Sequence, residues 1–263
     1  MRFSFVHITD HHILPSEDDL ARGFNTAYSL RKTLRHIAET VGGRFDFIVS
    51  TGDLVNTGED AQYENFARMV GLEKASPPPG PQRVTIEGLA RCPIYFLGGN
   101  HDPRATFYRQ IFGVERDGLL NATFLHRGVQ FVCFDWGPDV KAVASREMLD
   151  FLDSALRAPQ PSVLMCHHAV TPVGAAWLDK FLADDLDAFW DTIAGRNVLG
   201  IFTGHVHMTY EQYVEGIPVF GLRSTMFQFA LTPHPTMVLD TPHYRLVTVD
   251  DGVLTTRVFE VPI

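Results

Sequence analysis

The chain has 263 residues, of which 45% are hydrophobic and 20% are charged. These proportions are close to globular averages and exclude a disordered chain, a collagen-like fibre and a coiled coil. With 22 basic and 31 acidic residues, the net charge is −9, which argues against broad binding to nucleic acids or anionic membranes. The three cysteines, Cys92, Cys133 and Cys166, are too few for a disulfide framework. We expect them to be buried thiols in a reducing compartment.

The length lies between one and two typical domains, since a domain averages roughly 150 residues and an α/β fold often reaches about 250. We predict a single domain over residues 1–263. No stretch of about 18 apolar residues is present, so we expect no membrane span. The first residues lack the basic region and apolar core of a signal peptide, and we expect a cytoplasmic protein.

The hydrophobic pattern predicts strands and helices that alternate along most of the chain. In chain order, we predict a strand at 3–8, a helix at 25–41, a strand at 45–50, a helix at 60–72, strands at 94–97 and 129–134, a helix at 145–158, a strand at 163–166, a helix at 181–193, and strands at 198–202, 217–222, 244–249 and 254–261. This alternation is typical of an α/β fold that contains parallel strands.

Histidine is unusually frequent, with 12 residues in the chain. Seven of them stand in four clusters that directly follow apolar runs: His11 and His12, His101, His167 and His168, and His205 and His207. Ligands bind at the carboxyl ends of the strands in α/β sheets, so we expect these clusters to converge on one site.

Five short motifs follow predicted strands in a fixed order: Asp10-x-His12, Gly52-Asp53, Gly99-Asn100-His101-Asp102, His167-His168 and Gly204-His205-Val206-His207. Taken singly, Asp-x-His and Gly-Asp are also ordinary turn sequences. Taken together, they offer nitrogen and oxygen donors without thiolate, which suits Mn²⁺, Fe or Zn²⁺. The donors are too many for one tetrahedral ion and about enough for two divalent transition metal ions.

These motifs spread over nearly the whole chain and resemble those of the calcineurin-like metallophosphoesterases. The resemblance implies an α/β fold, a four-layer α/β/β/α sandwich of two mixed sheets flanked by helices, with a dinuclear metal centre. It also implies roles for eight residues: Asp10, His12 and His207 would hold the first metal, Asn100, His167 and His205 the second, Asp53 would bridge them, and His101 would be the catalytic histidine that contacts the phosphate and the leaving group.

Finer details resemble the class III cyclic nucleotide phosphodiesterases and the related glycerophosphodiesterases. They are the stretches Pro172-Val173-Gly174 and Trp177-Leu178-Asp179, and a tail with Gly216-Ile217-Pro218-Val219, Ser224-Thr225 and Gln228-Phe229. Two departures border the expected pocket: the chain has His168-Ala169-Val170 where this subgroup usually has His-His-Pro-Pro, and residues 71–91 form an insertion. We expect residues 208–244 to form a lid or a dimer segment.

The expected activity is hydrolysis of a small phosphodiester, with 3′,5′-cyclic AMP as the first substrate, by attack of a metal-bound hydroxide on phosphorus. The alternatives are a glycerophosphodiesterase or broad-specificity phosphodiesterase, a phosphomonoesterase, and a metal-free interaction scaffold. We expect no long nucleic acid or membrane as partner, and we expect a homo-oligomer, dimer or higher.

Several neighbouring residues have two possible roles. His11 and His168 either pack in the core or support the metal ligands. Asp102 either caps a helix or orients His101. Arg223 forms a surface ion pair or binds phosphate, and Phe227 and Phe229 either make core or dimer contacts or stack on a base.

Overall fold

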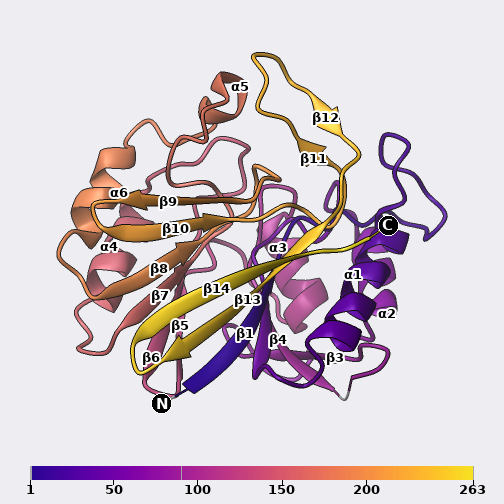
Figure 1. Ribbon diagram of the computed structural model, residues 1–263, viewed down its shortest axis with the longest axis horizontal. Coiled ribbons are helices and arrows are strands. Elements are labelled where there is room, and N and C mark those ends of the chain that lie inside the picture. Colours follow the sequence, from indigo (N-terminus) through magenta and orange to yellow (C-terminus); the bar gives the residue numbers. More distant parts are fainter. Residues whose placement is uncertain (1, 90, 263) are drawn as a thin grey trace.

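The computed structural model describes residues 2–89 and 91–262, and their strands form two large mixed sheets (Figure 1). The first sheet has the order β14-β13-β1-β2-β4-β3. Its strands are β1 (Arg2–Ile8), β2 (Phe47–Ser50), β3 (Gln82–Val84), β4 (Cys92–Phe96), β13 (His243–Asp250) and β14 (Val253–Glu260). Strands β1, β2 and β4 run parallel to one another, so their carboxyl ends meet at one edge.

The second sheet has the order β5-β6-β7-β8-β10-β9. Its strands are β5 (Ala122–His126), β6 (Val129–Cys133), β7 (Ser162–Met165), β8 (Val198–Phe202), β9 (Tyr210–Val214) and β10 (Ile217–Gly221). The four inner strands are parallel, and the edge strands β5 and β9 are antiparallel to their neighbours. A separate short hairpin pairs β11 (Gln228–Phe229) with β12 (Met237–Val238).

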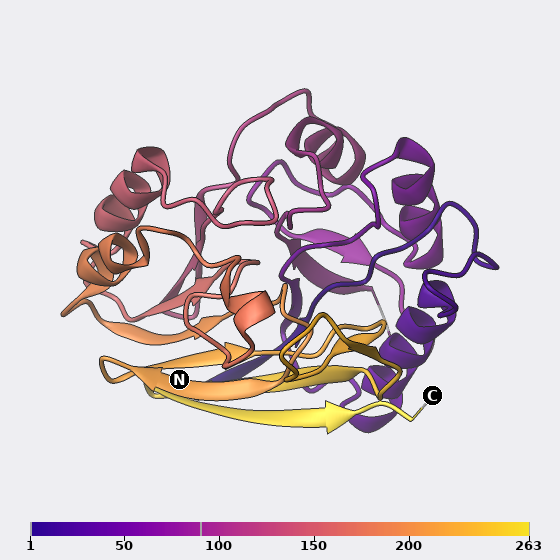
Figure 2. The ribbon, with the colours of Figure 1, turned by 90° about the horizontal axis from the view of Figure 1, so that it is seen from above.

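Helices cover the outer face of each sheet, as Figure 2 shows from above. Helices α1 (Thr26–Thr40) and α2 (Asp60–Met69) lie on the first sheet, and α4 (Arg146–Ala155) and α6 (Leu186–Ile193) on the second. Shorter turns are α3 (Arg104–Phe107), which continues as the π-helical segment η1 (Tyr108–Phe112), and α5 (Ala176–Asp179). The expected α/β/β/α sandwich is confirmed.

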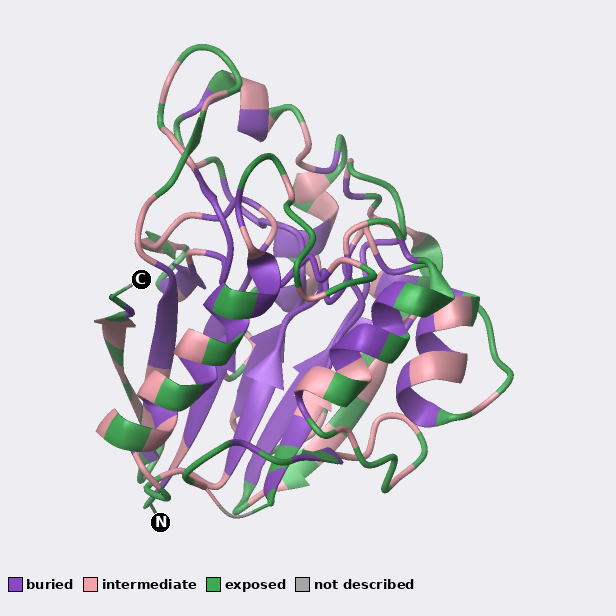
Figure 3. Ribbon diagram, turned by 90° about the vertical axis from the view of Figure 1, so that its right-hand side faces the viewer, coloured by how far each residue is buried: buried purple, intermediate pink, exposed green. Residues whose placement is uncertain are grey.

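Three apolar layers hold the sandwich together, and Figure 3 shows how burial concentrates in the strands and the inward faces of the helices. One layer lies between the first sheet and its helices, another between the second sheet and its helices, and the third between the sheets. Phenylalanine dominates the middle layer. Phe5 stacks on Phe47 with ring centroids 5.5 Å apart and meets Phe131 and Phe202 edge to face, an arrangement that adds to the stabilisation from burial.

The predicted elements agree with the structure at the buried strands and at the edge strand β14, and the predictions omit β3, β5, β9 and the two hairpin strands. Strands β5 and β9 alternate between exposed and half-buried residues, and β3 and the two hairpin strands are very short, so none of them produces a long apolar run. The helix predicted at 181–193 begins later, at Leu186. Residues 71–91, predicted as an insertion, contain β3, which extends the first sheet beside β4. The described helices include none that is long and apolar enough to cross a membrane.

The three cysteines are buried free thiols, as predicted. Burial raises the pKa of Cys92 and of Cys133 to about 12, so neither is a reactive thiolate near neutral pH.

A buried ion pair connects the two sheets where the strands end. Arg104, the first residue of α3, donates from Nε and Nη2 to both carboxylate oxygens of Asp135, at 2.6 Å each. Its Nη1 donates to the carbonyl oxygen of Gly99, at 2.7 Å. Since Arg104 is 4% exposed and Asp135 5% exposed, the pair is largely shielded from water.

Replacing Arg104 by glutamine should lower the free energy of unfolding by about 3–5 kcal/mol, because Asp135 would remain buried without its countercharge. The matched change Arg109→Gln breaks an ion pair between Arg109, whose side chain is 40% exposed, and Asp60, whose side chain is 53% exposed. Because this pair is open to water, its loss should change the free energy of unfolding little. Urea unfolding of both variants tests this difference. Equal losses would contradict the special role of the buried pair.

Candidate metal centre and pocket

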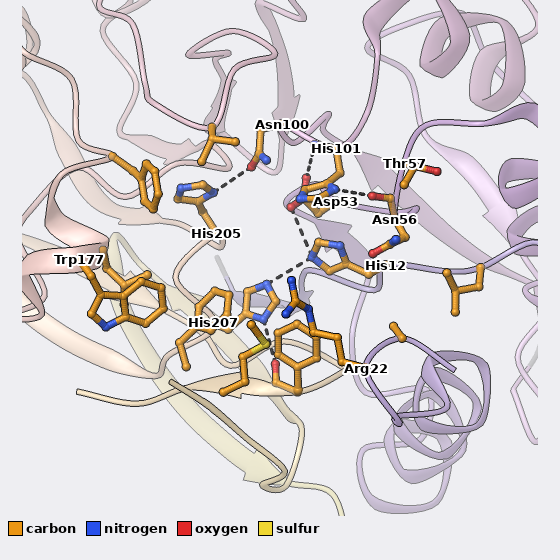
Figure 4. Close-up of a pocket in the computed structure, with 18 of the residues that line it drawn as sticks. His12, Arg22, Asp53, Asn56, Thr57, Asn100, His101, Trp177, His205 and His207 are labelled. Atoms are coloured by element: carbon orange, nitrogen blue, oxygen red, sulfur yellow. Dashed lines mark hydrogen bonds and ion pairs between the residues drawn. The ribbon is translucent and has the colours of Figure 1, made fainter. Parts of the chain in front are cut away.

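Eight polar residues converge where five strands end in the space between the two sheets. Asp10 and His12 follow β1, Asp53 follows β2, Asn100 and His101 follow β4, His167 follows β7, and His205 and His207 follow β8. Figure 4 shows six of them around one pocket, from Asn100 and His205 on one side to His12 on the other. The predicted convergence at the carboxyl ends of the strands is therefore observed.

Backbone hydrogen bonds fix the first two of these loops against each other. The amide of Asp10 donates to the carbonyl of Gly52 at 3.0 Å, and the amides of His11 and His12 both donate to the carbonyl of Asp53, at 2.8 and 3.0 Å. The third loop joins through its own amide, since the N–H of His101 donates to Oδ1 of Asp53 at 2.8 Å. The Asp53 side chain is thus held in one orientation by the protein backbone.

Five site residues have a left-handed backbone, with φ values of +56° at Asp10, +47° at His12, +51° at Asp53, +68° at His205 and +48° at His207. Such values are uncommon for residues other than glycine and cost on the order of 1 kcal/mol or more each. Their concentration in one place indicates that the fold maintains strain here to orient these side chains.

Two glycines of the motifs are required by close packing against carboxylates. A Cβ atom on Gly99 would overlap Oδ1 of Asp53. A Cβ atom on Gly204 would overlap the hydroxyl of Thr9 and lie 2.6 Å from Oδ2 of Asp10. Glycine at both positions lets the loops approach the carboxylates, which explains its place before Asn100 and before His205.

One group of donors consists of Asp10, His12 and His207, and their ligand atoms lie within 4.8 Å of one another. Nε2 of His207 lies 3.3 Å from Oδ1 of Asp10 and 3.3 Å from Nε2 of His12. Nε2 of His12 is also 3.4 Å from Oδ2 of Asp53. These are the residues that the family resemblance assigns to the first metal.

A second group lies on the other side of Asp53. The Nε2 atom of His167 is 3.3 Å from Oδ2 of Asp53 and 3.1 Å from Oδ1 of Asn100. Nδ1 of His205 lies 2.9 Å from the same Asn100 oxygen. Asp53 therefore faces both groups with one carboxylate oxygen, which is the position that a bridging ligand would need.

The hydrogen bonds of the imidazoles show that this cluster suits cations. Nδ1 of His207 lies 2.8 Å from the carbonyl oxygen of Phe227, and Nδ1 of His167 lies 2.8 Å from that of Thr51. A carbonyl oxygen only accepts, so both Nδ1 atoms carry hydrogen. In both rings Nε2 is then the atom that faces the carboxylate oxygens. A divalent cation that replaces any proton on Nε2 would be coordinated by imidazole nitrogen and carboxylate oxygen together.

The pKa values reflect the same crowding of charge. Burial alone would raise the pKa of Asp10, but the rings of His207 and His167 hold it well below its usual range. His167 responds in the opposite way, because the Asp53 and Asp10 carboxylates outweigh its burial and raise its pKa to about 9. Burial lowers the pKa of His12 to about 3. The carboxylates are therefore ionised and require positive charge beside them.

His101 lies at the edge of the metal cluster and is half-buried. Its Nδ1 donates a short hydrogen bond to the carbonyl oxygen of Asn56, which leaves Nε2 available to a ligand. Its ring meets the His12 ring edge to face, with centroids 4.7 Å apart. A ligand atom of His101 also lies within 4.8 Å of ligand atoms of His12 and Asp53, so His101 borders the first group of donors at the pocket.

A pocket of about 520 Å³ opens over the cluster, a size typical of small-molecule sites. One part of its wall is polar, with His12, Asp53, Asn100, His101 and His205. The remainder is largely apolar, formed by Leu14, Leu20, Val140, Trp177, Leu178, Phe181, Phe227, Phe229 and Met237. The last three of these residues lie on or beside the β11–β12 hairpin, within the segment 208–244 that we predicted as a lid or dimer segment.

Neighbouring residues have roles that the sequence left open. Asp102 neither contacts His101 through its side chain nor caps α3, which has no side-chain cap. Its carboxylate accepts from Tyr63 Oη at 2.7 Å and from the amides of Gly99 and Leu54 at 2.9 and 3.2 Å. Asp102 therefore holds the loops that carry the site, His101 included, and the prediction that it caps a helix was wrong.

The other open residues are mainly structural. His11 bonds the hydroxyls of Thr225 and Ser50, and His168 bonds the carbonyl of Asp139. Arg223 forms an ion pair with Asp240 at 2.6 Å, as its surface role predicted. Finally, Phe227 and Phe229 belong to an apolar cluster and also line the pocket.

The sequence analysis missed the polar pocket residues Arg22, Asn56 and Thr57, and it named Trp177 without assigning it to the pocket. They lie on loops or on the short α5, outside the strand-end motifs. The only signal available was Arg22-Gly23, a pair compatible with a tight turn, and it does not specify a direction toward the site.

Comparison with known proteins agrees with the fold. Residues 3–217 match the calcineurin-like phosphoesterase family. A probable cyclic nucleotide phosphodiesterase of Colwellia psychrerythraea is 29% identical over 97% of this chain and 94% of its own. The 3′,5′-cyclic adenosine monophosphate phosphodiesterase CpdA of Escherichia coli is 29% identical over 98% of this chain and 89% of its own.

Among solved structures, a dimetal phosphatase of Danio rerio shares the fold, with a TM-score of 0.60 and 15% identity over 99% of both chains. The family match covers most of the chain, including all five strand ends that carry the donors. On this basis the chain belongs to the calcineurin-like phosphoesterase family.

Proposed function

We propose that this protein is a metal-dependent phosphodiesterase that hydrolyses small phosphodiesters, with 3′,5′-cyclic AMP as the first substrate to test. The observation that carries the proposal is the position of Asp53 between two groups of donors. One carboxylate oxygen lies 3.4 Å from Nε2 of His12 and 3.3 Å from Nε2 of His167. This arrangement suits two cations that share one carboxylate, and the names of the relatives supply the substrate class.

Two divalent transition metal ions, Mn²⁺, Fe or Zn²⁺ in identity, would lower the pKa of water toward neutrality and compensate the charge of a phosphate. Asp10, His12 and His207 would hold one of them. Asn100, His167 and His205 would hold the other, with Asp53 between. The carbonyl contacts of His167 and His207 hold each Nε2 atom directed inward, which orients the ligands before any cation arrives.

His101 is suited to protonate the leaving group. As a new bond forms between water oxygen and phosphorus, the bond from phosphorus to the leaving oxygen breaks and that oxygen needs a proton. Because Nδ1 of His101 is bonded to Asn56, the protonated ring can donate only from Nε2, the atom that faces the pocket. Proton donation of this kind typically contributes a factor of about 10²–10⁴.

The pocket supports a small substrate over a polymer. Its volume of about 520 Å³ accommodates a nucleotide-sized ester, and the net charge of −9 opposes the approach of long nucleic acids. The aromatic side chains of the wall offer a surface for a planar group. A linear glycerophosphodiester would use this apolar wall less fully, so we rank it second.

The purified protein should hydrolyse bis(p-nitrophenyl) phosphate faster than p-nitrophenyl phosphate, and a chelator should abolish the activity. The isosteric change Asp53→Asn should reduce the rate by more than about 100-fold, because the loss of one ligand charge weakens both cation sites. Metal content by elemental analysis should fall in parallel. The surface change Asp60→Asn is the matched control and should leave rate and metal content as in the wild type.

Other outcomes identify the alternatives. Faster hydrolysis of the monoester would indicate a phosphomonoesterase. If protein purified with Mn²⁺ or Zn²⁺ present shows neither activity nor bound metal, the metal-free interaction scaffold is the alternative that remains.

Replacing His101 by alanine should slow hydrolysis according to the leaving group. With 3′,5′-cyclic AMP, whose leaving alkoxide needs a proton, we expect a loss of about 100-fold or more. With bis(p-nitrophenyl) phosphate, whose leaving group is a weak base, the loss should be much smaller. Metal content should be unchanged. Equal losses with both substrates would reject His101 as the proton donor.

A further inference from the structure

Arg22 is a cationic side chain of the pocket that the metal centre does not explain. It lines the pocket together with His12 and His207, and in Figure 4 its side chain points toward these two rings. Among the residues that the structure describes, none forms an ion pair or hydrogen bond with its guanidinium, although Asp18 and Asp19 precede it closely in the chain. An arginine at a pocket with no anionic partner is available to an anionic ligand.

The backbone at Arg22 is strained in a way that directs this side chain. The amide of Ala21 donates to the carbonyl of Phe24, and the amide of Phe24 donates to the carbonyl of Ala21, both at 2.9 Å. Arg22 and Gly23 are therefore the two central residues of a tight turn, with φ values of +51° and +84°. Turns with positive φ at both positions favour Asn-Gly over Arg-Gly, so arginine adopts this conformation at an energetic cost.

The turn is anchored to the segment that carries Met226 and Phe227. Phe24 is 9% exposed and packs in one apolar cluster with Met226 and Phe227, against which Ala21 also packs. Phe227 in turn accepts the hydrogen bond from Nδ1 of His207 through its carbonyl. The position of Arg22 is thereby linked to that of a metal-site residue through a short chain of packed groups.

The groups around Arg22 favour a phosphate ester as the anion that it binds. The donor cluster would receive the phosphate of a bound ester, and Arg22 approaches from the side of His12 and His207. The apolar wall with Trp177 and Phe229 covers another side of the pocket. Guanidinium groups match phosphate oxygens well, because their N–H groups form parallel charge-assisted hydrogen bonds.

We propose that Arg22 is a substrate-binding residue, which binds a non-bridging phosphate oxygen of the bound ester and of its monoester product. This inference rests on the proposed phosphodiesterase function for the identity of the ester. It concerns affinity: Arg22 contacts substrate and product alike, so its loss raises KM and the Kd of product and leaves kcat nearly unchanged.

The test compares Arg22→Asn with Arg22→Lys. Asparagine suits the turn and removes the charge, whereas lysine keeps the charge without the planar fork. KM and kcat are measured with bis(p-nitrophenyl) phosphate, and the Kd of adenosine 5′-monophosphate is measured by calorimetry, which does not depend on turnover. Thermal unfolding provides the third measurement. The control is Arg83→Gln, which removes the same charge from an exposed position outside the pocket lining.

For Arg22→Asn we expect KM and Kd to rise about tenfold, the effect of losing one charged hydrogen bond, with kcat within about twofold and a Tm no lower than that of the wild type. Arg22→Lys should retain most of the affinity, and Arg83→Gln should match the wild type. Unchanged KM and Kd in an active Arg22→Asn enzyme would overturn the inference, as would a lower Tm without a change in Kd. Inactivity of the wild type toward diesters would refute the proposed function instead, while the Kd comparison would still decide on Arg22.

Discussion

The site is organised by two ionised carboxylates, Asp10 and Asp53, that are buried in the gap between the sheets. A buried carboxylate requires compensation by hydrogen bonds or positive charge. Backbone amides supply part of it, from His205 to Asp10 at 3.0 Å and from His101 to Asp53 at 2.8 Å. The imidazoles around them supply less than is needed, since burial lowers the pKa of His12 and of His205 and keeps both rings neutral, whereas the Asp53 and Asp10 carboxylates raise the pKa of His167. The remaining negative charge is what gives the cluster its affinity for cations.

This constraint explains why strained backbone and close contacts at glycine occur together at the site. Left-handed residues at Asp10, Asp53 and His207 turn the chain sharply after each strand, so that the side chain points back over the sheet edge. Parallel strands bring several such ends to one edge, and the buried Arg104–Asp135 pair fixes the relative position of the two sheets beside them. The strain of each turn is offset by burial in three apolar layers that lie away from the site. Rigidity of the sandwich is therefore the condition for a preorganised donor set.

The sequence predicts the central strands and the strand-end motifs because both depend on local patterns. A buried parallel strand is a continuous apolar run, and the donors follow it directly, as at His167 and His205. The edge strands β5 and β9 escape prediction because half of their residues face solvent. The role of Asp102 also escapes, because its partners Tyr63, Leu54 and Gly99 are brought to it only by tertiary packing. The same is true of Arg104 and Asp135, which lie 31 positions apart in the chain.

Arg22 lies on a connection between regular elements, and the sequence pattern does not predict that such residues reach the pocket. The donors come from strand ends, whose positions are fixed by sheet register, so metal chemistry is set by the fold. The rest of the pocket wall comes from connections: the turn at Arg22, the short α5 with Trp177, and the hairpin that carries Phe229. Such connections can change without disturbing the sheets. Relatives that share the donors can therefore differ in the ester that they accept, and the substrate of this chain must be argued from its loops. A loop that retains a strained arginine toward the pocket, where asparagine would fit the turn better, indicates that the charge of the ligand is part of what this wall recognises.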